Sequence, residues 1–334
     1  MAVEEQHDLL DSARDRMLVS TIVPALNEEG NIDEFCRLYA DMLKTAPFEG
    51  ELVFVDDGST DGTVEKIRQA VQQYSFIKYA SHQRNRGLTA ALETGFSIAS
   101  GEIFVFYPAD LQYLPEDIPV LVKPVAEGAD LCAGWKQGKY KKKLVSNVYN
   151  WISRRIFNLK VHDLNSVKAF RREVVENIFL RRDWHRYLVV LAADEGYRVE
   201  EVKIPLYDRQ WGQSKFGGIG RVMVGLLDML AVKFQITFLR KPLLFFGLVG
   251  SLCFLAGLLI GLAALYLRFV VGEGYRPLLY LVILLMGVGM GLFMMGFMAE
   301  GLTALREEIS DMRNKVQALV LHVKRRGYGD RSDQ

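Results

Sequence analysis

Cysteine is scarce in this sequence, and net charge is almost absent. The three cysteines, Cys36, Cys132 and Cys253, are scattered through 334 residues, and no pair has the CxxC spacing. This pattern argues against a disulfide framework or a zinc site and is typical of reduced thiols in a protein that faces the cytosol. The formal net charge of +1 provides no strong positive field, so no nucleic-acid partner is expected.

The common nucleotide-binding signatures are also missing. No G-x-G-x-x-G follows an apolar run and no P-loop is present, which argues against a dehydrogenase and a P-loop NTPase. Residues 1–16 are polar and charged, without the apolar core of a secretory signal, and are interpreted as an N-terminal leader.

Two long stretches, Pro242 to Leu267 and Pro277 to Ala299, contain no charged residue. Each exceeds the roughly 20 residues needed to cross a bilayer core. Buried helices of a soluble protein are the alternative, but such helices rarely continue so long without a charge. We therefore expect transmembrane helices over residues 242–270 and 277–299, followed by a cytosolic helix and tail over residues 300–334.

Basic residues indicate the orientation of these helices. Arg240 and Lys241 precede the first apolar stretch, and several basic side chains follow the second, while the connection between the two is short. By the positive-inside rule, the N-terminal domain and both chain ends are expected in the cytoplasm, at the inner membrane of the cell.

Glycines four residues apart occur in both stretches, at Gly257 and Gly261 and at Gly287 and Gly291. Small residues at this spacing let helices approach closely in lipid. These faces are therefore expected to pack, either within one chain or in a homo-oligomer.

The segment Leu52 to Thr63, LVFVDDGSTDGT, is the most informative part of the chain. Its apolar run predicts a strand buried on both faces, as in a parallel sheet, and Asp56 and Asp57 stand at its carboxyl end. Ligands of open α/β sheets bind at that edge, so the two acids are candidate binding residues. The alternative is that they only shape the turn.

Strands and helices alternate around this segment. Further strands are expected at residues 17–23, 77–80, 103–107 and 129–135, and helices at 32–43, 64–73 and 88–99. This order predicts an α/β fold with a mostly parallel sheet covered on both faces, in a cytosolic domain over residues 17–218.

Two amphipathic helices are expected beside the membrane. Residues 137–157 combine lysines and arginines with Leu144, Val148 and Trp151 on one face, which is typical of a helix at an anionic membrane surface. An ordinary solvated helix is the alternative. A second apolar stripe, over residues 219–241, leads directly into the first apolar stretch.

Several short motifs occur in a fixed order: VPALNEE, LVFVDDGSTDGT, FYPADLQ, HDLNS and DRQWGQSKFGG. Together they resemble the family 2 glycosyltransferases, whose GT-A fold is a Rossmann-like nucleotide-diphospho-sugar transferase domain. With two C-terminal spans, the chain is most similar to the polyisoprenyl-phosphate glycosyltransferases, which include dolichol-phosphate mannose synthase and bacterial undecaprenyl-phosphate sugar transferases. The resemblance covers about Ser20 to Ala299.

The resemblance implies a nucleotide-sugar donor site. Pro24, Leu26 and Glu28 correspond to residues that line the family's nucleoside pocket. Asp57, next to Asp56, corresponds to the acid that contacts the base. The nucleotide is expected to be UDP or GDP.

The resemblance also implies a divalent metal, Mg²⁺ or Mn²⁺, on the donor's diphosphate. Asp110 corresponds to the second acid of the family's D-x-D motif and Gln112 to the amide two residues on, and both are implied ligands. Such ions take hard oxygen ligands, often only one or two from the protein, with phosphate oxygens completing the shell. Pro108 replaces the first acid of the motif, which leaves a non-catalytic nucleotide-binding membrane protein as one alternative.

Asp163, in HDLNS, corresponds to a family acid near the reacting centre. A lipid monophosphate has a second pKa of about 6 and is largely dianionic near neutral pH. Asp163 is therefore expected to orient the nucleophile rather than deprotonate it. The alternative is that Asp163 caps the next helix.

The segment R-x-x-G-x-S-K places Arg209, Ser214 and Lys215 in a loop that, in the family, closes over the donor and acceptor phosphates. Arginine supplies a bidentate fork and lysine a point charge for such phosphates. Lys136, where relatives often carry arginine, is a further candidate for binding the acceptor phosphate. Its alternative role is that of a lysine at the membrane surface.

Asp110, Asp163 and Arg209 are thus the predicted catalytic residues of a membrane-anchored glycosyltransferase. The expected reaction moves a sugar from a nucleotide sugar to polyprenyl phosphate at the cytoplasmic leaflet and releases a nucleoside diphosphate. A processive polysaccharide synthase is a further alternative, but the chain lacks Q-x-x-R-W, and two spans are few for a conducting channel.

Overall fold

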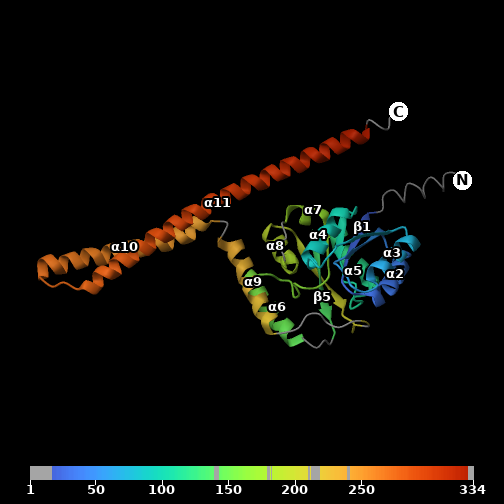
Figure 1. Cartoon of the computed structure of the whole chain (residues 1–334), viewed down its shortest axis with the longest axis horizontal. Helices are drawn as coiled ribbons and strands as arrows, with labels where there is room; N and C mark the ends of the chain where they lie inside the picture. Colours follow the sequence, from blue (N-terminus) through green and yellow to red (C-terminus); the bar gives the residue numbers. More distant parts are fainter. Residues whose placement is uncertain are drawn as a thin grey trace. The chain divides into compact units, whose positions relative to one another are not determined.

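The computed structural model describes residues 17–138, 143–178, 181, 183–209, 211, 219–238 and 241–329. The chain divides into two compact units, residues 1–222 and residues 223–334. The first contains a sheet with helices around it, and the second consists of long helices (Figure 1).

A seven-stranded sheet forms the centre of the first unit, in the order β3-β2-β1-β4-β6-β5-β7. Its strands are β1 (Leu18–Ala25), β2 (Glu49–Asp56), β3 (Ile77–Ser81), β4 (Ile103–Phe106), β5 (Leu131–Gln137), β6 (Lys168–Arg171) and β7 (Val199–Pro205). Only β6 runs antiparallel to its neighbours, β4 and β5. The other neighbouring pairs are parallel, which confirms the predicted mostly parallel α/β sheet.

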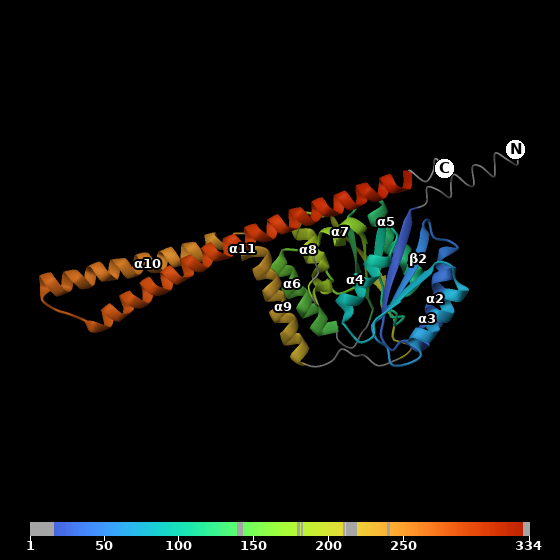
Figure 2. The same ribbon diagram turned by 45° about the horizontal axis from the view of Figure 1, so that its top comes forward.

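Helices cover both faces of this sheet. α2 (Glu29–Leu43) and α3 (Thr63–Gln73) lie on one side and α4 (Leu88–Ile98) on the other (Figure 2). Alternate side chains of β1 face the two sides, so Val23 packs with Phe35 of α2 in one core while Ile22 meets α4. Gly95 permits that second contact, because a Cβ there would lie 2.4 Å from Ile22 Cγ2.

Further helices of the first unit lie between β4 and β7 in the sequence. They are α5 (Ile118–Ala126), α6 (Lys143–Phe157), α7 (Arg172–Asn177) and α8 (Leu188–Asp194), with 3₁₀ turns at Pro115–Asp117 and Trp184–Tyr187. The basic helix expected over residues 137–157 is α6, described from Lys143 to Phe157, and Gln137 belongs to β5 instead. In α6, the exposed fractions of Val148 and Trp151 are 50% and 62%.

The helix α9 (Ile219–Phe238) is followed by α10 (Pro242–Tyr266), a π-helical turn (Leu267–Val271) and α11 (Arg276–Gly329). Two stretches, Pro242–Val271 and Arg276–Leu305, are long and apolar enough to cross a membrane. α11 continues beyond the second stretch without a break, so the expected second span and the charged helix after it are a single helix.

α10 and α11 lie side by side and contact each other through glycine backbones (Figures 1 and 2). A Cβ on Gly250 would lie 2.6 Å from the Gly289 carbonyl oxygen, and a Cβ on Gly289 would lie 2.6 Å from the Gly250 carbonyl oxygen. Gly257 also meets α11, as expected, but Gly287 and Gly291 have no neighbour within 4 Å. Within one chain Gly287 and Gly291 therefore do not pack against α10, because Gly289, between them, lies on the contacting face, and packing of these two glycines in a homo-oligomer stays a prediction.

Gly250→Ala is expected to destabilise the α10–α11 hairpin, because its methyl group would lie 2.6 Å from the Gly289 carbonyl oxygen and 2.7 Å from the Phe293 backbone nitrogen, so the two helices must move apart. Overpacking of this kind typically costs about 1–3 kcal/mol. Gly287→Ala is the matched control, since its methyl group projects into open space. Thermal unfolding of the detergent-purified full chain should show a lower midpoint for Gly250→Ala alone, and equal midpoints would contradict the packing described.

Candidate active site

The carboxyl ends of β1, β2 and β4 meet at one edge of the sheet. Ala25 pairs with Asp56 in the register of β1 and β2. The Asp57 backbone N–H donates to the Ala25 carbonyl over 2.9 Å, and the Tyr107 N–H donates to the Ile22 carbonyl over 3.0 Å. The loops that carry the VPALNEE, DDGSTDG and PADLQ motifs therefore leave the sheet together.

Side-chain hydrogen bonds join the first two of these loops. Asn27, which has a positive φ of 53°, donates its N–H to Ser59 Oγ over 2.9 Å and accepts the Thr60 N–H at Oδ1 over 2.8 Å. The Glu28 N–H donates to Thr63 Oγ1 over 2.8 Å. These bonds fix the backbone that presents the buried Glu28 carboxylate.

The Asp57 carboxylate binds the loop after β3. It accepts the N–H groups of Arg86 and Gly87 over 2.9 and 2.8 Å and lies 2.7 Å from His82 Nδ1. His82 Nε2 is 2.9 Å from Thr94 Oγ1. These contacts organise residues 82–87, and Asp57 is only 5% exposed. The expected contact of Asp57 with a base stays a prediction.

Asp56 stabilises its own turn. Its carboxylate accepts the N–H groups of Gly58 and Ser59 over 3.2 and 3.1 Å and the hydroxyl of Ser81 over 2.8 Å. Gly58 has a φ of 79°, and a Cβ there would lie 2.5 Å from the Arg84 carbonyl carbon, so only glycine fits. The predicted nucleoside residues Pro24 and Leu26 are half-buried at the same edge.

Arg209 links two acids of the site, Glu28 and Asp110. Its guanidinium is 2.5 Å from Asp110 Oδ2 and 3.7 Å from Glu28 Oε1, so one side chain joins the loop after β1 to the loop after β4. The loop after β7 is held there by its backbone, because the Tyr207 N–H donates to the Gln112 carbonyl over 2.9 Å. The Gln112 side-chain N–H₂ donates in return to the Tyr207 carbonyl over 3.4 Å.

Electrostatics at Asp110 are dominated by burial, which raises the pKa of this carboxyl. The Arg209 charge and the N–H of Gln112 oppose that rise, since both favour the ionised form. The Arg209 guanidinium and the Gln112 N–H thus stabilise the ionised form of a carboxyl that burial disfavours.

The donor set fits a divalent metal bound chiefly by phosphate. The described residues contain no cluster of three or more His, Cys, Asp or Glu side chains that could hold an ion alone. Asp110 offers a buried carboxylate and Gln112 an amide in the same short turn, which are hard oxygen ligands of the kind Mg²⁺ and Mn²⁺ take beside phosphate oxygens. Pro108 offers no ligand, so the protein would contribute few of the bonds to such an ion.

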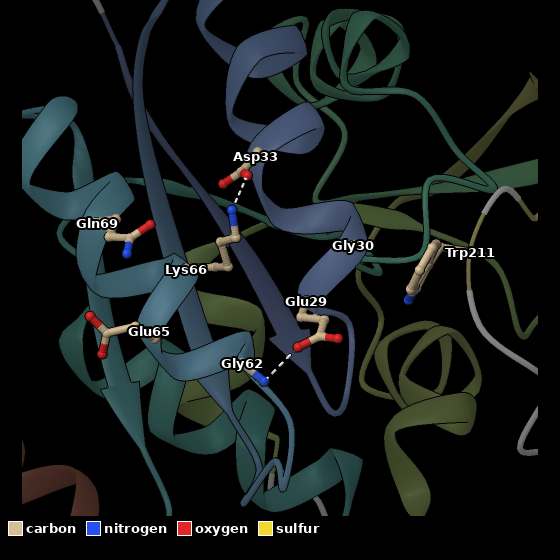
Figure 3. A pocket seen from close by; sticks show the side chains of 8 residues that line it. All are labelled: Glu29, Gly30, Asp33, Gly62, Glu65, Lys66, Gln69 and Trp211. Carbon is tan, nitrogen blue, oxygen red and sulfur yellow. Dashed lines mark hydrogen bonds and ion pairs between the residues drawn. The ribbon is translucent and has the colours of Figure 1, made fainter.

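Trp211, two residues after Arg209, lies beside Gly30 at the start of α2 (Figure 3). A Cβ on Gly30 would lie 2.6 Å from the indole ring, so glycine is required for this contact. A cavity of about 400 Å³ opens there, and none of the predicted site residues lines it. Ser214 and Lys215, expected in the same loop, lie outside the described residues.

Asp163 and Lys136 form a second ionic pair, with Asp163 Oδ2 3.0 Å from Lys136 Nζ. Asp163 is 1% exposed, and its Oδ1 accepts the Asn165 N–H over 3.1 Å. The alternative that Asp163 caps a helix is wrong, because the chain continues into the strand β6. A hydrogen bond between Tyr113 and Ser166, 3.0 Å long, places this turn beside the loop that carries Asp110.

A buried lysine, which the sequence analysis missed, lies beneath this pair. Lys168 is 1% exposed, donates to the Ser166 carbonyl over 2.7 Å, and has its ammonium 5.7 Å from the centre of the Phe106 ring. Burial lowers the pKa of Lys168 to about 8, against the opposing attraction of Asp163. Lys168 is the first residue of the four-residue strand KAFR, and so short a segment gave no sequence signal of this environment.

Lys168 should make stability depend on pH in a defined window. The pKa of Lys168 is about 8 in the folded chain, below its usual 10.5. Between these pH values the unfolded chain therefore binds more protons than the folded chain, and the free energy of unfolding increases as pH rises. Relative to Lys168→Met, the wild type is expected to gain up to about 3 kcal/mol between pH 8 and 10.5. Thermal unfolding of the wild type and of Lys168→Met across that pH range measures the difference. Lys123→Met, at an exposed position, is the control and should follow the wild type. If stability depended on pH in the same way in all three proteins, the role assigned to Lys168 would be contradicted.

The sheet order, with an acidic carboxyl edge bridged by Arg209, is that of the GT-A fold. Solved structures support the fold: glucosyl-3-phosphoglycerate synthase from Mycobacterium tuberculosis, in complex with Mn²⁺, UDP and glucosyl-3-phosphoglycerate, superposes with a TM-score of 0.53 at 22% identity. The superposition covers 67% of this chain and 83% of that one. The same enzyme with Mg²⁺ and UDP gives a TM-score of 0.52.

The chain belongs to glycosyl transferase family 2, whose sequence profile matches residues 20–186. It is 31% identical to dodecaprenyl-phosphate galacturonate synthase of Rhizobium johnstonii, over 84% of this chain and 86% of that protein. It is 28% identical to undecaprenyl-phosphate 4-deoxy-4-formamido-L-arabinose transferase of Pseudomonas paraeruginosa, over 87% of each chain. The predicted family is confirmed.

Proposed function

We propose that this glycosyltransferase transfers one sugar from a UDP- or GDP-linked donor to the phosphate of a polyprenyl phosphate at a membrane surface. The observation that carries the proposal is the bridge of Arg209 to Glu28 and Asp110, which joins three loops over the carboxyl edge of the sheet. Two further features support it: the relatives are named for polyprenyl-phosphate products or acceptors, and two helices can span a bilayer.

In the proposed reaction, an oxygen of the lipid phosphate attacks the anomeric carbon of the sugar. The bond from that carbon to the donor's diphosphate oxygen breaks, and the electron pair leaves with the nucleoside diphosphate. Asp110 and Gln112 would hold a divalent cation on the diphosphate, and that ion would neutralise the charge of the leaving group. Arg209 would supply a second, protein-borne positive charge on the same oxygens.

The Asp163–Lys136 pair is proposed to meet the acceptor. Lys136 provides a positive charge for the lipid phosphate, and Asp163 orients both the lysine and the incoming nucleophile. Because the phosphate is already largely ionised near neutral pH, positioning contributes more here than proton abstraction. Glu28, Pro24 and Leu26 are proposed to border the nucleoside.

The membrane arrangement is also a proposal. Residues 17–218 would form the catalytic domain and 219–241 an interface helix, with spans over 242–270 and 277–299, and the domain and both chain ends in the cytoplasm. The exposed Trp151 and Val148 of α6, next to Arg154 and Arg155, suit the head-group region of an anionic leaflet.

A transfer assay tests the function. Purified protein in detergent is incubated with undecaprenyl phosphate, Mg²⁺ or Mn²⁺ and a panel of UDP- and GDP-sugars, and the lipid fraction is analysed by mass spectrometry. One donor is expected to give a lipid heavier by a single sugar, and chelation of the metal is expected to remove the product. A ladder of longer products would favour the processive synthase. Nucleotide binding without any product would favour a non-catalytic protein.

A further inference from the structure

Glu201, in the middle of β7, holds the turn that contains Asp163. Its Oε1 accepts the backbone N–H of His162 over 2.6 Å and that of Asp163 over 3.1 Å. Its Oε2 lies 2.7 Å from His162 Nδ1. With a side chain only 13% exposed, this single carboxylate makes three contacts to two consecutive residues.

The same carboxylate is tied to the strand that carries Lys136. β5 and β7 are parallel neighbours, with Ala133 opposite Glu201. The His162 ring, held by Glu201, stacks on Trp135 with ring centroids 4.1 Å apart and planes 11° apart. Trp135 directly precedes Lys136, so Glu201 contacts the backbone of Asp163 itself and, through the His162 ring, the residue next to Lys136.

Hydrogen bonds from a carboxylate to backbone N–H groups are stronger than neutral ones and define direction as well as distance. The Asp163 side chain leaves the backbone at the amide that Glu201 binds, so loss of this bond frees the turn to rotate its carboxylate away from Lys136. Displacements of about 1 Å at reacting groups can cost on the order of 100-fold in rate.

We propose that Glu201 is a positioning residue for sugar transfer, which holds the Asp163 carboxylate against Lys136 at the acceptor phosphate. This inference rests on the proposed function. Glu201 touches neither donor nor acceptor in this account and acts only through the backbone of residues 162 and 163.

Three variants separate this role from general stability. Glu201→Ala removes all three contacts. Glu201→Gln keeps an oxygen for both backbone N–H groups and offers its N–H₂ to His162 Nδ1, so it should preserve the turn. Glu200→Ala is the control on the same strand, because Glu200 pairs at the surface with Arg198.

Hydrogen exchange of the full chain in detergent gives a readout that does not depend on activity. Glu201→Ala is expected to speed exchange of the 162 and 163 amides, while Glu201→Gln and Glu200→Ala leave it unchanged. Equal protection of these amides in Glu201→Ala and the wild type would overturn the proposal whatever the reaction is.

Transfer kinetics then test the role. Glu201→Ala is expected to lower kcat by about 10- to 100-fold while the donor KM changes less than about twofold, with Glu201→Gln and Glu200→Ala close to wild type. An unchanged kcat in Glu201→Ala, or an equal loss in Glu201→Gln, would overturn the positioning role. Absence of lipid product from the wild type would overturn the proposed function, and with it a role for Glu201 in that reaction, even if the exchange result stands.

Discussion

Asp110→Asn is expected to lower kcat for sugar transfer by about 100-fold or more, the largest effect of any single substitution in the site. Asparagine keeps the shape and can still accept the Gln112 N–H, but it removes the negative charge that Arg209 meets at 2.5 Å. Because Pro108 replaces the first acid of the D-x-D motif, no neighbouring carboxylate in that turn can take the place of Asp110 as a metal ligand. Initial rates at saturating donor and acceptor measure the effect.

The control for this substitution is Asp130→Asn. Asp130 lies at the amino end of β5, at the opposite edge of the sheet from the site, and its carboxylate accepts the backbone N–H of Arg198. That variant should retain the wild-type rate. Pro108→Asp adds the missing acid and is expected to lower the metal concentration that gives half-maximal rate. Transfer by Asp110→Asn at the wild-type rate would contradict the role assigned to Asp110.

Arg209→Lys is expected to lower kcat by on the order of 100-fold, although the positive charge is retained. A guanidinium can bridge two acids, here Glu28 and Asp110, with separate N–H groups, whereas an ammonium is a single point of charge. The same fork would be needed to bind two oxygens of the donor's diphosphate. The donor KM is expected to rise as well.

Arg37→Lys is a matched control, because Arg37 also contacts two acids, Glu34 and Asp41, but on the exposed surface of α2. Exposed ion pairs contribute little, so this variant should match the wild type in rate and stability. If Arg209→Lys also matched the wild type, the bridge between the two loops would have no part in the reaction.

The parallel half of the fold could be predicted because its strands are apolar runs bounded by turn residues. The segment LVFVDD became β2 and its acidic end, and the helices after β1, β2 and β3 begin within a few residues of their predicted positions. β6 and β7 escaped prediction. The first is four residues long and contains the buried Lys168, and the second carries Glu200, Glu201 and Lys203 in a half-buried edge strand.

The helix α5 was missed for a different reason. Pro119 stands in its first turn, where proline is tolerated, and Pro124 stands near its end, so the sequence resembles a loop. In the second apolar helix, the four-residue spacing of Gly287 and Gly291 was the basis for predicting a packing face. The contacting glycine is Gly289, which only the pairing of α11 with α10 determines.

Motif resemblance named the acids and the arginine of the candidate site, and the structure brings Glu28, Asp110 and Arg209 within ion-pair distance. It did not indicate how Asp163 is held. The contact with Lys136 requires β5 to end beside the turn after α6, and the contact with Glu201 requires β7 to pair with β5. Such long-range pairings are not encoded in any local pattern.

The most direct test of the central claim follows the oxygen atoms of the acceptor. Polyprenyl phosphate carrying ¹⁸O on its phosphate is incubated with wild-type protein and the active nucleotide sugar, and both products are analysed by mass spectrometry. The account predicts a lipid that gains one sugar and retains all of its label, together with unlabelled nucleoside diphosphate. A lipid that gains a sugar phosphate, with release of a nucleoside monophosphate, would contradict it.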